Sequence, residues 1–147
     1  MTSAADFFSK EDQILIKQAI EEAETNTSGE IRIHIENKCS GDVMDRAAFL
    51  FAKLEMHKTQ LRNGVLFYLA IHDRKFAILG DAGINAKVPK SFWNHTNEET
   101  LGYFKQGEFA KGLSEGIKMA GQQLKTHFPY QADDVNELSD DISFGDN

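Results

Sequence analysis

The most constraining feature of this 147-residue chain is a run of seven apolar residues, Val65 to Ile71. A strand whose residues do not alternate between apolar and polar is buried on both faces, so helices must cover it above and below. The turn that follows, His72 to Lys75, is charged and too short for a crossover, so the next apolar run, residues 76–79, must return antiparallel. The pair therefore predicts an α/β domain rather than an all-β one.

The preceding residues add a parallel strand to this pair. Residues 30–36 alternate apolar and polar positions, as in a strand, and residues 43–56 return to helical periodicity. A strand, a helix and a second strand form a βαβ unit, whose two strands are parallel. A serine with an acid three residues later, Ser9 and Asp12, predicts an earlier helix start. We expect a three-layer α/β/α sandwich around a small mixed β-sheet that contains one βαβ unit and one β-hairpin.

Helical patterns continue after residue 84. Residues 94–99 form a polar stretch that we interpret as a connection between helical pieces, and residues 108–127 predict the longest helix. Its glycines should mark close approach to a neighbouring element: Gly112, Gly116 and Gly121. We assign residues 1–130 to the α/β domain and residues 131–147 to an acidic tail packed on it, in which residues 142–144 could add an edge strand.

Charge is distributed unevenly along the chain. The net charge is −7, yet six acidic residues and no lysine or arginine follow Lys125, so the body is nearly neutral. A neutral body excludes the basic surfaces that bind nucleic acid, and no apolar run is long enough for membrane insertion. The single cysteine, Cys39, excludes an internal disulfide, and the N-terminus lacks the pattern of a secretory signal. We expect a cytoplasmic monomer.

Oxygen-bearing side chains gather at one end of the predicted sheet. The starts of the two parallel strands and the end of the antiparallel strand must lie together there, and they carry Glu30, Asn63, Asp81 and Asn85. Carboxylate and amide oxygens are the ligands that Ca²⁺ and Mg²⁺ prefer, and the tail could complete the shell. The alternative is that Asp81 and Asn85 only cap a helix and that Glu30 is a solvated strand end.

Other chemistries fit the sequence less well. The turn at residues 80–83 lacks the lysine of a phosphate-binding loop. Cys39 and Arg46 are separated by six residues rather than the five of a cysteine phosphatase, so Cys39 is better interpreted as an ordinary thiol. The five histidines are scattered without the spacing of a zinc site.

Several segments together resemble the TPM domain family: residues 27–32 (TSGEIR), 62–66 (RNGVL), 73–78 (DRKFAI), 80–85 (GDAGIN) and 136–145 (NELSDDISFG). The resemblance covers nearly the whole chain and is to a stand-alone form of the domain. It implies an α/β/α domain that binds divalent metal, calcium especially, and an acid phosphatase activity assigned to some members. The metal ligands expected from the resemblance and from the acidic tail are Glu30, Asp81, Asp133, Asp134 and Glu137.

Three functional hypotheses remain open. The favoured one is a metal-responsive regulatory or binding module in which Ca²⁺ or Mg²⁺ draws the tail against the domain. The alternative is a metal-assisted acid phosphatase, in which the cation polarises a phosphomonoester and activates water. The third is a protein-interaction module whose acidic tail binds a basic protein partner without any metal.

Overall fold

The computed structural model describes residues 3–130 and 138–145. Within these residues the chain forms one mixed sheet in the order β3-β2-β1-β4. β1 is parallel to both of its neighbours, β2 and β4, whereas β3 returns antiparallel to β2. The strands are β1 (Glu30–Glu36), β2 (Gly64–Ala70), β3 (Lys75–Gly80) and β4 (Ser143–Phe144).

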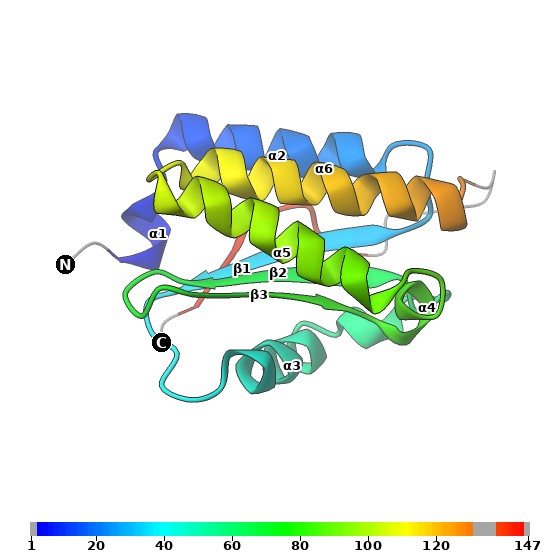
Figure 1. The fold of residues 1–147 in the computed structure, drawn as a ribbon, viewed down its shortest axis with the longest axis horizontal. Coiled ribbons are helices and arrows are strands. Elements are labelled where there is room, and N and C mark those ends of the chain that lie inside the picture. Colours follow the sequence, from blue (N-terminus) through cyan, green and yellow to red (C-terminus); the bar gives the residue numbers. More distant parts are fainter. Residues whose placement is uncertain (1–2, 131–137, 146–147) are drawn as a thin grey trace.

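Helices cover both faces of this sheet (Figure 1). One face carries α2, α5 and α6, and the opposite face carries α3, so the predicted three-layer α/β/α sandwich is confirmed. The helices are α1 (Ala4–Phe7), α2 (Lys10–Glu24), α3 (Val43–Lys53), the 3₁₀ helix η1 (Met56–Lys58), α4 (Ala82–Asn85), α5 (Lys90–Lys105) and α6 (Phe109–His127). None of the helices in the described part of the chain has the length and apolar character needed to cross a membrane.

The alternation in β1 explains how two hydrophobic cores form. Ile31, Ile33 and Ile35 are fully buried on the face covered by α2 and α6. The uninterrupted apolar β2 contributes to both faces: Phe67 joins that first core, while Leu66 packs with α3 in the second. A strand buried on both faces is therefore what the apolar run predicted, and every residue of β2 is buried.

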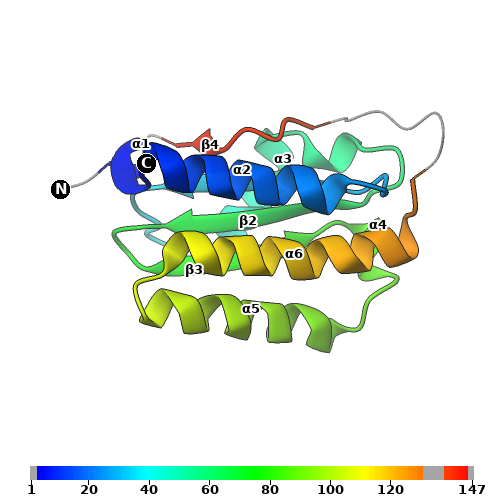
Figure 2. The same cartoon turned by 90° about the horizontal axis from the view of Figure 1, so that it is seen from above.

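The glycines of α6 permit the close helix packing that the sequence predicted. A Cβ atom at Gly116 would lie 2.6 Å from Oγ1 of Thr100 in α5, and one at Gly121 would lie 2.7 Å from Cβ of Ala23 in α2. Real Cβ atoms do not approach other atoms so closely, so a larger residue at either position would push α6 from a neighbour. Figure 2 shows α6 running between α2 and α5.

Two elements differ in detail from the sequence predictions. Residues 94–99 do not connect helical pieces, because α5 continues through them; Thr96 and Thr100 are fully buried, and their hydroxyls donate to the carbonyls of Phe92 and Thr96 at 2.9 Å. The predicted edge strand of the tail is confirmed as β4, which pairs with His34 and Ile35 of β1.

Candidate functional site

The three strand junctions predicted to meet do lie at one end of the sheet. Glu30 pairs with Gly64 at the start of the parallel strands, and the N–H of Glu30 donates to the carbonyl of Asn63 at 3.4 Å. The N–H of Asp81, directly after β3, donates to the carbonyl of Gly64 at 2.9 Å. The sheet therefore brings Glu30, Asn63 and Asp81 to one end, where each belongs to or adjoins a different strand.

At this edge Asp81 is engaged with Arg62. Its two carboxylate oxygens each accept a 2.7 Å hydrogen bond from the Arg62 guanidinium, and Oδ1 also accepts from the N–H of Ala82 at 2.8 Å. Hydrogen bonding to Asp81, followed by its charge, raises the pKa of Arg62. Asn85 is also engaged, because its amide donates to the Gly80 carbonyl and accepts from the Trp93 indole, both at 2.8 Å. Asp81 therefore caps α4, as the alternative interpretation expected, whereas the Asn85 side chain links Gly80 to Trp93 and does not cap the helix.

Glu24, a carboxyl group that the sequence analysis did not select, lies near Glu30 and makes a side-chain hydrogen bond with Asp140. Oε2 of Glu24, the last residue of α2, accepts a hydrogen bond from the N–H of Ile31 at 2.8 Å. Burial, the side-chain hydrogen bond with Asp140 and the nearby charge of Glu30 together raise the pKa of Glu24 to about 10. We call Glu24, Glu30 and Asp140 the carboxyl cluster.

Burial is the main cause of the raised pKa of Glu24, and the neighbouring carboxyl groups add to it. Two or more carboxylates in a poorly solvated place repel one another, so one of them keeps its proton unless a cation takes the proton's place. The carboxylate of Glu30 belongs to a residue that is only 2% exposed, so water screens this repulsion weakly. We therefore expect the carboxyl cluster without metal to bind a proton more tightly than a solvated carboxylate does.

Further polar atoms near the cluster lack partners within residues 3–130 and 138–145. Oδ1 of Asn63 is buried there without a hydrogen bond, while its amide nitrogen donates weakly to Oγ of Ser28 at 3.4 Å. Oδ1 of Asp140 is likewise buried without a hydrogen bond among these residues. Buried acceptors are usually satisfied by a donor, a water molecule or an ion, so both oxygens require an explanation.

The remaining predicted ligands, Asp133, Asp134 and Glu137, lie outside the described residues. The described chain reaches this segment from Tyr130, whose N–H donates to the carbonyl of Asn26 at 3.0 Å, and resumes at Leu138, which packs against the second core. Both attachment points lie near the strand junctions. Among the described residues, no group of three or more His, Cys, Asp or Glu side chains is arranged so that it could hold a metal ion, and this includes the carboxyl cluster.

A second polar network lies along β1 and β2, toward their carboxyl ends. The carboxylate of Glu36 is fully buried and accepts two 2.8 Å hydrogen bonds from Arg46 and one from the hydroxyl of Tyr68. Burial opposes ionisation, but these hydrogen bonds hold the pKa of Glu36 below its ordinary value. Arg46 is thus occupied, and the buried thiol of Cys39 donates to the Gly41 carbonyl at 3.6 Å. This arrangement agrees with the ordinary thiol that the sequence favoured.

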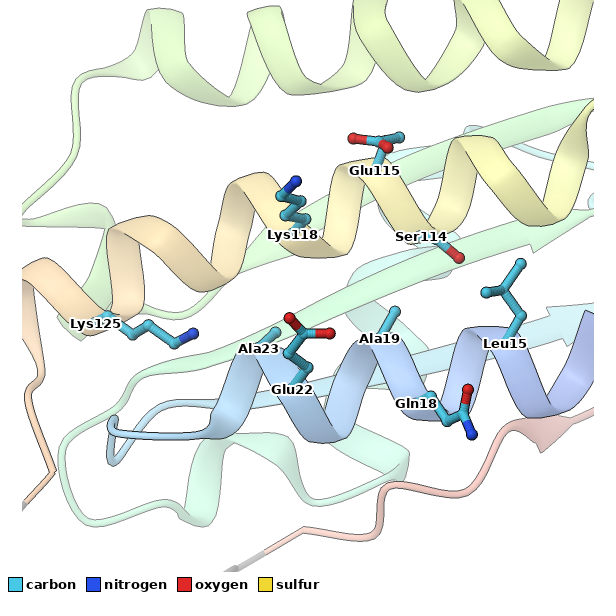
Figure 3. Close-up of a pocket in the computed structure, with 9 residues that line it drawn as sticks. All are labelled: Leu15, Gln18, Ala19, Glu22, Ala23, Ser114, Glu115, Lys118 and Lys125. Atoms are coloured by element: carbon cyan, nitrogen blue, oxygen red, sulfur yellow. The ribbon is translucent and has the colours of Figure 1, made fainter.

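A groove also runs along the surface between the packed helices α2 and α6 (Figure 3). Acidic and basic side chains from the two helices border it, among them Glu22, Glu115, Lys118 and Lys125. They come from several turns of both helices, so they do not converge on one point as the ligands of a metal or a substrate would (Figure 3). The carboxyl cluster therefore remains the stronger candidate site.

Comparison with known proteins gives the family. The TPM domain profile matches residues 1–123. The BA42 protein from the psychrophilic bacterium Bizionia argentinensis, solved by NMR, is 46% identical, superposes with a TM-score of 0.90, and the alignment covers 99% of this chain and 100% of that one.

Two more distant structures share the fold. The N-terminal domain of a protein from P. gingivalis is 17% identical, with a TM-score of 0.71 over 86% of this chain and 84% of that one. The N-terminal domain of cg2496 from Corynebacterium glutamicum is 14% identical, with a TM-score of 0.66 over 89% and 82%. No protein with curated function matches the chain. The chain therefore belongs to the TPM domain family, as its sequence motifs predicted.

Proposed function

We propose that this domain is a metal-responsive regulatory or binding module that takes up a divalent cation, Ca²⁺ or Mg²⁺, at the carboxyl cluster. The observation that carries the proposal is the position of Glu24, a partly buried carboxyl group that accepts from the Ile31 N–H and lies close to Asp140 and Glu30. Its raised pKa agrees with this crowding. A cation supplies the positive charge that the proton supplies in the metal-free protein. Hard divalent cations bind carboxylate and amide oxygens, which are the groups present here.

The proposed ligands come from both parts of the chain. Glu24, Glu30 and the amide oxygen of Asn63 belong to the domain, and Asp140 belongs to the tail. Calcium takes six to eight oxygens, so the described groups leave room for the predicted ligands Asp133, Asp134 and Glu137. A ligand role for Asp81 remains a prediction, and it requires that the cation displace Arg62 from the bidentate ion pair.

The regulatory output follows from where the ligands lie. Asp140 is three residues before β4, which adds to the edge of β1 through Ser143 and Phe144. A cation shared by Asp140 and Glu30 would tie the tail to the start of β1. Metal concentration would then control how firmly the tail is held on the domain. The regulatory output would be this change in the position of the tail.

A calcium titration followed by amide chemical shifts tests this proposal. The reporter is the N–H of Ile31, which donates to Glu24 and must respond when that carboxyl group changes partner. Saturable shifts at Ile31 that are lost in Glu24→Gln, but kept in the exposed neighbour Glu22→Gln, would support the proposal. Unchanged shifts at Ile31 in millimolar calcium would contradict it.

The metal-assisted phosphatase is kept as a second candidate because of one further observation. A hollow beside Arg32 is lined by Lys58, Thr59 and Ser139, which are groups able to hold phosphate oxygens. Release of phosphate from p-nitrophenyl phosphate, dependent on metal and lost in both Glu24→Gln and Arg32→Gln, would support this activity. Equal turnover by the two variants and the native chain would indicate a contaminant.

A further inference from the structure

The outer edge of β3 has no strand partner among the described residues. β3 is the terminal strand in the order β3-β2-β1-β4, and within the described ranges no strand pairs with its far side. The N–H of Asp81 points to β2, so by alternation the main-chain groups of Ala77 and Leu79 also face β2. Those of Phe76 and Ile78 therefore face outward. The Gly80 carbonyl agrees with this alternation, because it bonds to the Asn85 side chain rather than to β2.

This edge lacks several of the usual protections against strand pairing, although α5 lies outside it. Proteins blunt an exposed edge with proline, inward-pointing charges or a bulge, or cover it with a helix or loop. The sequence of β3 after Lys75 is Phe-Ala-Ile-Leu-Gly, without any charge or proline, and it pairs with β2 in unbroken register. Phe76, Ala77 and Ile78 are each at most 9% exposed, so the unpaired backbone of this strand is recessed rather than openly exposed.

The open edge lies at the floor of a groove. The groove encloses about 440 Å³, a volume within the range of binding clefts, and extends along β3 from Phe76 to Gly80. Val43 and Met44 of α3 form one wall, and residues of α5 form the other, with the apolar ring of Trp93 and the amides of Asn94 and Asn97. Asn94 and Asn97 are three residues apart, so they lie on one face of α5.

We propose that this groove binds an extended peptide segment of a partner protein, which adds to the sheet as a fifth strand beside β3. An extended backbone can pair with the outward N–H and C=O groups of both Phe76 and Ile78, and alternate apolar side chains of the peptide would face the two walls. Side-chain amides can donate to and accept from a peptide backbone, which gives Asn94 and Asn97 a role in holding it.

Charge and shape restrict the occupant further. Among the described residues that line the groove, Lys90 carries the one charged side chain, so an uncharged or acidic segment fits and a basic segment does not. In the view from above, α5 lies outside β3, on the side away from β2 (Figure 2). A second copy of the whole domain would bring its own helical layers against α5, whereas a single strand can lie beneath it. The inference is independent of the metal site, which lies around the start of β1.

The test uses the full chain and a displayed library of random seven-residue peptides, from which individual binders are made as free peptides. We expect selected peptides to be uncharged or acidic with apolar residues at alternate positions. Their binding should shift the amide resonances of Phe76 and Ile78. Asn97→Arg, which fills the groove with a long side chain, should weaken binding by about tenfold or more.

His95→Arg is the matched control, because it adds the same charge on an exposed position of α5 that does not line the groove. It should leave binding unchanged. The proposal is overturned if no peptide is enriched, or if the selected peptides bind Asn97→Arg as well as the native chain. It is also overturned, in favour of a second copy, if the protein dimerises without peptide and the dimer shifts Phe76 and Ile78.

Discussion

Glu24 illustrates how a single residue acquires its chemistry from its neighbours. It follows Glu21 and Glu22 in α2, and nothing in the sequence distinguishes the three. In the folded chain Glu24 is partly buried, bonds to the Ile31 N–H and lies beside two other carboxyl groups, whereas Glu22 is exposed. Its role depends on contacts with residues 6 to 116 positions away, which a local pattern does not encode.

The raised pKa of Glu24 makes a prediction about stability without metal. Its folded-state pKa, about 10, lies above the ordinary value of 4.5, so the native state binds this proton more tightly than the unfolded state does. The contribution of Glu24 to the free energy of unfolding is present in full below pH 4.5. It is lost as pH rises toward 10, with a slope of up to about 1.4 kcal/mol per pH unit. Thermal unfolding measured from pH 5 to 9 in the presence of a chelator should show this decline.

Glu24→Gln should flatten this dependence, because glutamine is neutral at every pH, and Glu22→Gln should keep it. Added calcium should restore stability at pH 8 in the native chain and not in Glu24→Gln. Parallel curves for the native chain and both variants would show that Glu24 does not hold the proton.

At the scale of elements, glycines in two helices differ in whether packing requires them. Gly121 lets α6 approach α2 at Ala23, whereas nothing lies within 4 Å of a Cβ placed on Gly102 in α5. Gly121→Ala should therefore destabilise the protein by about 1–3 kcal/mol through overpacking. Gly102→Ala should stabilise it by about 0.5–1 kcal/mol, because alanine favours the helix.

Denaturant unfolding of the two variants measures both effects on one scale. A comparison of this kind is informative because the chemical change is the same and only the surroundings differ. Stabilisation by Gly121→Ala would mean that α2 and α6 do not pack as closely as described.

Most elements could be predicted from the sequence because local chemistry specifies them. The apolar run of β2 requires cover on both faces, and the hydroxyl of Ser9 does accept from the N–H of Asp12 at the start of α2, at 3.0 Å. The middle of α5 was predicted as a loop because its residues are polar. The sequence does not show that Thr96 and Thr100 are buried, or that Thr100 packs against α6, which favours a continuous helix. The strand order is a long-range property that the sequence pattern left open.

The candidate site was predictable only in part, for a similar reason. Topology brings the strand junctions together, so Glu30 and Asn63 could be placed at one edge. The pairing of Asp81 with Arg62 depends on a side chain at a left-handed backbone position, with φ of 52° at Arg62, which no pattern indicated. The predicted ligands Asp133, Asp134 and Glu137 remain predictions.

At the scale of the whole molecule, the tail is where the two parts of the chain are coupled. Asp140 lies beside Glu24, while its neighbour Asp141 is exposed and pairs with Lys17 at 2.8 Å. Asp140→Asn should weaken calcium binding by about tenfold or more, because it removes the charge of a proposed ligand. Asp141→Asn changes the net charge equally and should leave the affinity nearly unchanged, which calorimetry can measure. Equal losses in both variants would point to a general charge effect instead.

The exchange of a proton for a cation at the carboxyl cluster is the central claim, and calorimetry in two buffers tests it most directly. Calcium is titrated into the full chain at pH 7 in Pipes and in Tris, whose ionisation heats differ strongly. Binding must ionise Glu24, so we predict release of about one proton per cation and a correspondingly different heat in the two buffers. No binding heat, or the same heat in both buffers, would contradict the account.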